Sequence, residues 1–157
     1  MTTDTTTTHV TGNPGELGEV TITRDFAAPR ELVFAAFFDP EQLAQFWGPT
    51  GTHAPVEHIV IEARPGGRFE TLMVADDGSG EFPTKAVFVE IDEPESFSFI
   101  EPDAGMTTAS TFTDLGDGRT RLVIHQTQVP EMYRSPDALA GFLTSLDRFD
   151  AYLATVA

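Results

Sequence analysis

Hydrophobic and polar residues alternate through most of the middle of the chain. From Glu19 to Phe26, the apolar residues Val20 and Ile22 are separated by threonines, and the same period of two recurs further along. Such alternation is typical of a β-strand with one buried face. It predicts a first strand ending at Phe26 and six more strands: Val56–Ala63, Arg68–Ala75, Thr84–Asp92, Ser96–Glu101, Thr107–Leu115 and Thr120–Val129.

The connectors between these stretches are short and rich in glycine, proline and aspartate, as in Gly116-Asp117-Gly118. Turns of this composition join neighbouring strands into hairpins, so the sequence predicts an antiparallel meander. The connector Arg64-Pro65-Gly66-Gly67 could suggest a phosphate-binding loop. Such a loop requires a helix after it, whereas a strand is predicted here, so we interpret it as a structural turn.

Two short helices are predicted after the first strand. Pro29 opens a helical stretch from Arg30 to Phe38. Asp39 then provides a cap with a proline in the following first turn, which is a strong helix start. This second helix carries Trp47 and is stopped by Gly48-Pro49.

The end of the chain changes to a helical period. Ser135-Pro136-Asp137 supplies a cap, a first-turn proline and an N-terminal acidic residue. The apolar residues that follow form a single stripe on a helix of about 20 residues. They are Leu139, Phe142, Leu143, Leu146, Phe149, Leu153 and Val156.

Together these elements predict an α+β domain with a helix-grip arrangement. A curved antiparallel sheet of about seven strands would wrap around the long C-terminal helix, with the two short helices at one end, which leaves an internal pocket. Residues 17–157 form this single domain. The Thr-rich residues 1–16 are interpreted as a disordered leader, with an additional edge strand as the alternative.

Composition and charge narrow the function. The chain has 157 residues, no cysteine, 13 phenylalanines and a net charge of −16. Its nine basic residues are scattered, which argues against nucleic acid and anionic membranes as partners. No membrane span or signal peptide is visible, so we expect a cytoplasmic protein, either a monomer or a homodimer. No cofactor is implied.

Strand parity identifies the side chains that face the pocket. On the last strand, Leu122, Ile124 and Gln126 share the apolar parity, while His125 points outward. Gln126 is therefore the expected polar contact, and Ser110 faces inward as well. The predicted ligand-binding residues are Trp47, His58, Phe69, Met73, Phe97, Phe99, Phe112, Gln126, Phe142 and Leu146.

No catalytic residue or metal site is predicted. General acid–base catalysis needs paired titratable groups, and the carboxylates fall mostly at turns, with no base evident on the inward parity. His53 and His58 lack the spacing of a zinc site, although His58 is retained as a possible ligand contact.

Several short segments, taken in order, resemble the SRPBCC or START-like superfamily. They resemble in particular the subfamily related to the C-terminal domain of the Hsp90 ATPase activator. The segments span about residues 19–154 and include Ile22–Pro29, Phe46-Trp47-Gly48-Pro49, Arg64–Phe69, Val89–Pro94, Phe112–Leu122, Gly141-Phe142 and Leu146–Phe149. The family often has tryptophan where this chain has Phe46 and Phe142.

The resemblance implies a cavity for hydrophobic ligands such as lipids, sterols, polyketides or aromatic compounds. The leading hypothesis is a carrier or sensor of a small apolar or aromatic molecule. Two alternatives remain open. One is a cyclase- or dehydratase-like enzyme acting on a polyketide or aromatic substrate. The other is a chaperone-interacting protein, for which an exposed apolar patch is expected.

Overall fold

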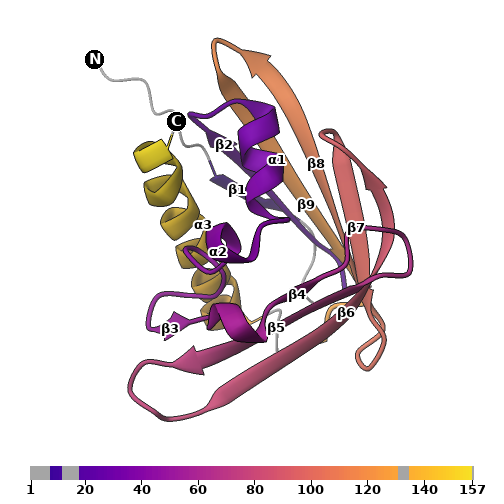
Figure 1. Ribbon diagram of the computed structural model, residues 1–157, viewed down its shortest axis with the longest axis vertical. Helices are drawn as coiled ribbons and strands as arrows, with labels where there is room; N and C mark the ends of the chain where they lie inside the picture. The colour runs from indigo at the N-terminus through magenta and orange to yellow at the C-terminus, as the bar shows by residue number, and fades with distance from the viewer. Residues whose placement is uncertain (1–7, 12–17, 131–134, 157) are drawn as a thin grey trace.

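A computed structural model describes residues 8–11, 18–130 and 135–156 (Figure 1). The chain forms one antiparallel sheet, a long C-terminal helix and shorter helices between them. The strands are β1 (Thr8–Thr11), β2 (Val20–Phe26), β3 (Thr52–His53), β4 (Val60–Ile61), β5 (Arg68–Ala75), β6 (Glu81–Asp92), β7 (Ser96–Glu101), β8 (Met106–Gly116) and β9 (Arg119–Thr127). The helices are α1 (Arg30–Ala36), α2 (Pro40–Leu43), the 3₁₀ helix η1 (Val56–His58) and α3 (Pro136–Val156).

The sheet curves, and α3 lies across its open side with α1 and α2 between them (Figure 1). Its strand order is β1-β2-β9-β8-β7-β6-β5-β3, with β4 also paired to β5. From β5 to β9, strands adjacent in sequence are paired in hairpins, as the short turns predict. This is the helix-grip fold expected from the sequence. The seven expected strands correspond to β2 and β4–β9, and β1 and β3 are additional.

Two expectations about strands need correction. Thr8–Thr11 form β1, which pairs with β2, so the alternative of an edge strand holds for these four residues and the interpretation as a disordered leader does not. Residues 1–7 and 12–17 lie outside the described part of the chain.

The predicted strand Val56–Ala63 is mostly absent. Its first residues form η1, in which His58 N–H donates to the Pro55 carbonyl and Ile59 N–H to the Val56 carbonyl. These local bonds replace a strand ladder, because the donors close a turn. Only Val60–Ile61 remains as a strand, β4.

The short helices bring phenylalanine side chains into the curved sheet. Phe34 and Phe37 make tilted or edge contacts with Phe112 of β8, at centroid distances of 5.2 and 5.7 Å. Phe37 also meets Phe149 of α3 edge-on at 5.2 Å. Such pairings stabilise beyond their buried area, and phenylalanine has no polar atom that needs a partner. This cluster fills the end of the sheet beneath α1.

The Asp39 cap is confirmed, since its carboxylate accepts from the Glu41 N–H at 3.0 Å. Helical hydrogen bonds continue past α2, where Trp47 N–H donates to the Leu43 carbonyl. Phe46 and Trp47 therefore lie on the inner side of the fold.

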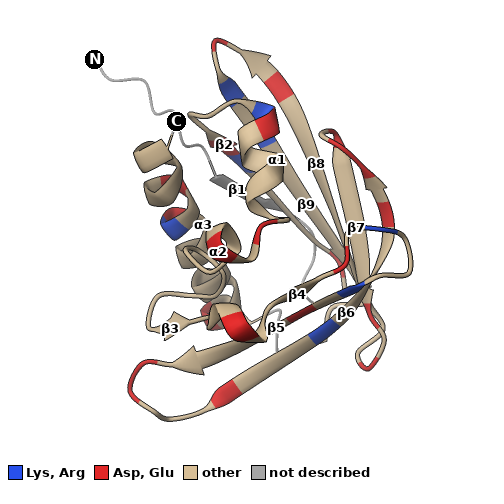
Figure 2. Cartoon of the chain, in the orientation of Figure 1, with Lys and Arg blue, Asp and Glu red and all other residues tan. Residues whose placement is uncertain are grey.

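Acidic residues occur at hairpin tips and at positions along the strands and helices, and basic residues are fewer (Figure 2). Of the helices described, none is long and apolar enough to cross a membrane.

Candidate functional site

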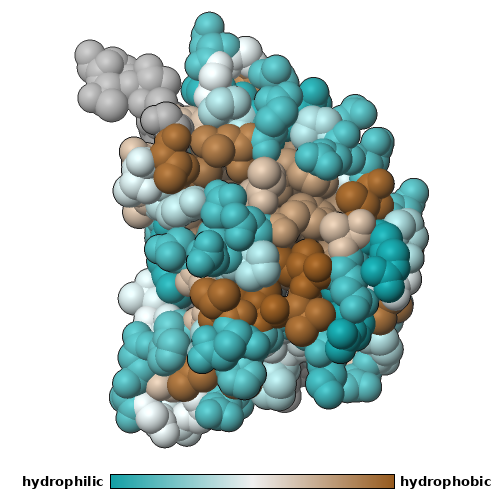
Figure 3. All heavy atoms as spheres, in the orientation of Figure 1, coloured by the Kyte–Doolittle hydropathy of each residue, from teal (hydrophilic) through white to brown (hydrophobic). Residues whose placement is uncertain are grey.

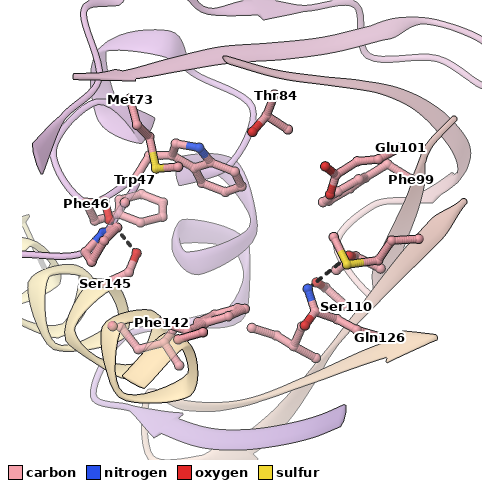
Figure 4. Close-up of a pocket in the computed structure, with 18 of the residues that line it drawn as sticks. Phe46, Trp47, Met73, Thr84, Phe99, Glu101, Ser110, Gln126, Phe142 and Ser145 are labelled. Atoms are coloured by element: carbon pink, nitrogen blue, oxygen red, sulfur yellow. Dashed lines mark hydrogen bonds between the residues drawn. The ribbon is translucent and has the colours of Figure 1, made fainter. Parts of the chain in front are cut away.

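A cavity of about 430 Å³ lies between the N-terminal half of α3 and strands β5–β9 (Figure 4). This volume is within the usual range for small-molecule sites, and the lining is mostly apolar. The lining residues are Phe37, Phe46, Trp47, Gly48, Pro49, Met73, Thr84, Phe97, Phe99, Glu101, Met106, Thr108, Ser110, Ile124, Gln126, Asp137, Ala138, Gly141, Phe142, Ser145 and Leu146.

One side of the cavity is an aromatic wall, formed by Phe46, Trp47 and Phe142 (Figure 4). The Trp47 Nε1–H donates to Thr71 Oγ1 at 3.0 Å. This bond satisfies the only polar atom of the indole and fixes the ring plane. The remainder of the ring is left as an apolar surface beside the cavity.

The segment that carries Phe46 and Trp47 is attached to α3 by polar contacts. Ser145 Oγ donates to the Phe46 carbonyl at 2.8 Å, and Arg148 Nη1 donates to the Gly48 carbonyl at 2.7 Å. Gly48 has φ +97°, and a Cβ there would lie 2.6 Å from Thr52 Oγ1 and 2.8 Å from Met73 Sδ. Glycine is therefore required at this bend.

The opposite side is a polar wall, formed by side chains of β7, β8 and β9 (Figure 4). Register aligns Phe99, Thr108 and Gln126 in one row across the three strands. Gln126 Nε2 donates to Thr108 Oγ1 at 3.2 Å. Ser110 lies in the neighbouring row and is buried. Here the polar wall means Glu101, Thr108, Ser110 and Gln126.

Glu101 is the charged residue of the polar wall and is among the lining residues that the sequence reasoning missed. It closes β7, two residues after Phe99, and reaches the cavity with its carboxylate (Figure 4). Partial burial raises the pKa of this carboxyl above its ordinary value, because the charged form loses hydration. The signal was present in the sequence, since Phe97, Phe99 and Glu101 share one strand parity. No base stands out on the inward parity in the sequence, but the Glu101 carboxyl lies there in the structure.

Seven of the ten predicted site residues line the cavity: Trp47, Met73, Phe97, Phe99, Gln126, Phe142 and Leu146. Phe69 and Phe112 face inward as predicted but lie behind the lining as buried core. Phe69 supports the site indirectly, through edge contacts with Trp47 at 5.4 Å and Phe99 at 5.0 Å.

His58 does not belong to the cavity. It lies exposed in η1, because this segment forms a 3₁₀ turn in place of the predicted strand. Its assignment to the site depended on a strand parity that does not exist there.

Among the residues that the structure describes, two acidic residues line the cavity, Glu101 and Asp137. Within the described ranges, no group of three or more His, Cys, Asp or Glu side chains is arranged to hold a metal ion. The arrangement suits a ligand whose apolar body lies against the aromatic wall and whose polar group faces the polar wall.

The face seen in Figure 3 is mainly hydrophilic, with hydrophobic atoms gathered near its middle. The large hydrophobic side chains with high exposure include Val56, Phe82, Val89 and Val156. They come from three different elements, η1, β6 and α3. Scattered residues of this kind are normal for a globular protein.

Comparison with protein families gives a match over residues 27–154, which is most of the chain. The matching model describes the Activator of Hsp90 ATPase homolog 1-like proteins. The chain belongs to this family.

Solved structures agree with membership in the Activator of Hsp90 ATPase homolog 1-like family. The protein Ms6760 from Mycobacterium smegmatis is 29% identical, with a TM-score of 0.79 over 97% of this chain and 99% of that one. A Chromobacterium violaceum protein, CV1439, is 26% identical, with a TM-score of 0.76 over 85% and 95%. The AHSA1 protein from Silicibacter pomeroyi, at 24% identity, shares the fold with a TM-score of 0.75 over 88% and 99%. No curated protein matches the sequence significantly.

Proposed function

We propose that this protein binds a small apolar or aromatic molecule in the cavity beneath α3, as a carrier or sensor. The observation that carries the proposal is the cavity itself, about 430 Å³ in volume and bordered by Phe46, Trp47, Phe99 and Phe142. A preformed concave site with an apolar lining and a few polar groups is the common form of a small-molecule site.

Binding is favoured over a cyclase- or dehydratase-like reaction. Acid–base catalysis needs two titratable groups placed about one reacting centre. Glu101 shares the polar wall with two hydroxyls and an amide, and the other acidic lining residue, Asp137, is in the first turn of α3. A chaperone-interacting function finds less support, because the exposed hydrophobic residues are dispersed.

Filling the cavity tests the proposal. Thr84 points into the cavity from β6 (Figure 4), and the next residue, Lys85, is exposed on the other face of the strand. Wild type should bind the neutral fluorophore N-phenyl-1-naphthylamine with an increase in its emission. Thr84→Phe should weaken binding by roughly tenfold or more, because the added ring occupies the ligand's space.

Lys85→Phe is the matched control, since it adds the same ring outside the cavity. It should leave probe affinity unchanged. Thermal unfolding of both variants shows whether they remain folded. Equal affinity of Thr84→Phe and wild type, or no binding of the fluorophore by wild type, would refute the proposal.

A further inference from the structure

The polar wall offers hydrogen-bond acceptors to a ligand. Gln126 uses its amide N–H to donate to Thr108, so its carbonyl oxygen is the atom left to accept. The Glu101 carboxylate accepts when ionised. Among the residues that the structure describes, no hydrogen bond or ion pair to the Glu101 side chain is observed. A ligand group that donates hydrogen bonds would therefore find acceptors in the Gln126 carbonyl and in the ionised Glu101 carboxylate, and the carboxylate can only accept.

Among the residues that the structure describes, the charged groups lining the cavity are of one sign. This lining includes Glu101 and Asp137 but none of the described Lys, Arg or His residues. The chain as a whole carries a net charge of −16, which adds a negative potential to that of the two carboxylates. An anionic ligand would be repelled, whereas a cation would be attracted.

The aromatic wall is compatible with a cation as well. Trp47 lies across the cavity from Glu101 (Figure 4), and Phe99 and Phe142 also border the space. Aromatic ring faces attract ammonium groups, and Phe99 is the labelled ring that lies beside Glu101 (Figure 4). The same rings provide apolar surface for the uncharged part of a ligand.

We infer that the cavity selects amines: molecules with an apolar or aromatic body and one protonated amino group. The amino group would donate to Glu101, with Gln126 as a second acceptor, and the body would lie against Phe46, Trp47 and Phe142. The inference rests on the proposed function and adds the chemical class of the ligand.

The ionisation behaviour of Glu101 is consistent with this pairing. Partial burial raises its pKa because the carboxylate loses water contacts. A bound ammonium group replaces that lost stabilisation, since an adjacent positive charge favours the ionised carboxyl. A neutral ligand of the same shape cannot form this ion pair, so it would bind with lower affinity.

Three probes with one ring system separate the possibilities: tryptamine, tryptophol and indole-3-propionate. They share an indole and a short side chain, and end in an ammonium, a hydroxyl and a carboxylate. Isothermal titration calorimetry at neutral pH should rank tryptamine about tenfold tighter than tryptophol, because charge-assisted hydrogen bonds are roughly twice as strong as neutral ones. Indole-3-propionate should bind weakest.

Glu101→Gln should reduce the preference for tryptamine over tryptophol to within about twofold, while tryptophol affinity is retained. Retained tryptophol binding also shows that the variant is folded. Glu90→Gln, which removes the same charge from an exposed position on β6, should keep the wild-type ranking.

The outcomes distinguish the two proposals. If tryptamine and tryptophol bind wild type equally, or if Glu101→Gln keeps the preference, amine selection is wrong and cavity binding stands. If Glu90→Gln abolishes the preference as fully as Glu101→Gln, the effect comes from net charge and the assigned pairing is wrong. If neither the three indoles nor N-phenyl-1-naphthylamine binds, the proposed function fails, and amine selection fails with it.

Discussion

The two halves of α3 carry the same apolar stripe but lie over different surroundings. In the C-terminal half, Leu146, Phe149 and Leu153 are buried. In the N-terminal half, Leu139, Phe142 and Leu143 are only partly buried. The aromatic residues beneath the helix account for the difference.

Under the C-terminal half, other elements fill the space between helix and sheet. Phe149 stacks on Phe46 at a centroid distance of 3.9 Å and also contacts Phe26 and Phe37, at 4.9 and 5.2 Å. The N-terminal half instead supplies lining to the cavity, including Ala138, Gly141 and Phe142. α1 and α2 together span only 11 of the residues, seven and four, and they fill one end of the curved sheet. The cavity is the space between α3 and the sheet that α1 and α2 do not fill.

The largest expected effect is at Phe149. Phe149→Ala should lower the free energy of unfolding by about 3–5 kcal/mol, because it removes a fully buried ring and leaves a cavity in packed core. Phe142→Ala removes the same ring from the other half and should cost about 1 kcal/mol, since this side chain already borders open space. Urea unfolding of both variants gives the comparison.

Phe142→Ala should also weaken binding of N-phenyl-1-naphthylamine, because the ring belongs to the aromatic wall. Equal losses of stability in the two variants would mean that the halves of α3 are packed alike. The proposed difference between the packed C-terminal half of α3 and the N-terminal half that lines the cavity would then be wrong.

The next effect concerns an ion pair between β2 and the same helix, α3. Arg24 Nη1 lies 2.7 Å from Asp147 Oδ1, with side-chain exposures of 6% and 65%. The Arg24 Nε is buried and has no hydrogen-bond partner within the part of the chain that the structure describes. Asp147→Ala leaves the guanidinium buried without this counter-ion, and should cost roughly 1–2 kcal/mol.

Adding Arg24→Met to Asp147→Ala should recover most of that loss, because an apolar side chain of similar length removes the uncompensated charge. Urea unfolding of the single and double variants tests this. A cost for Asp147→Ala as large as that for Phe149→Ala would indicate that the ion pair, rather than aromatic packing, holds the C-terminal half.

The sequence predicts the parts of this fold that depend on local periodicity. The boundaries of β5 and β7 match the predicted strands, and α3 begins at Pro136 as its cap indicates. Parity correctly placed Gln126 inside and His125 outside. Where alternation was weak, as at Val56–His58, a local turn formed in place of the strand.

The site was less predictable, because its position depends on which elements fill the sheet. Phe97 and Phe112 share the same inward orientation, yet only Phe97 borders the cavity. Parity cannot separate the two, since the distinction arises from α1 packing over β8. Glu101 could have been found by parity, because it shares the strand parity of Phe97 and Phe99.

The smallest expected effect is at Gly141, in the half of α3 that covers the cavity. A Cβ at Gly141 would lie 3.6 Å from the Pro49 Cβ, an ordinary contact distance. Alanine also has a higher helix propensity than glycine, so Gly141→Ala should raise the free energy of unfolding by up to about 1 kcal/mol. Ala140→Gly, at the exposed neighbouring position, makes the reverse change. Its loss of unfolding free energy measures the helix-propensity difference between alanine and glycine. If the gain from Gly141→Ala matches the loss from Ala140→Gly in urea unfolding, the added methyl meets no steric resistance. A net loss of stability in Gly141→Ala would instead mean that the N-terminal half is as tightly packed as the region around Phe149.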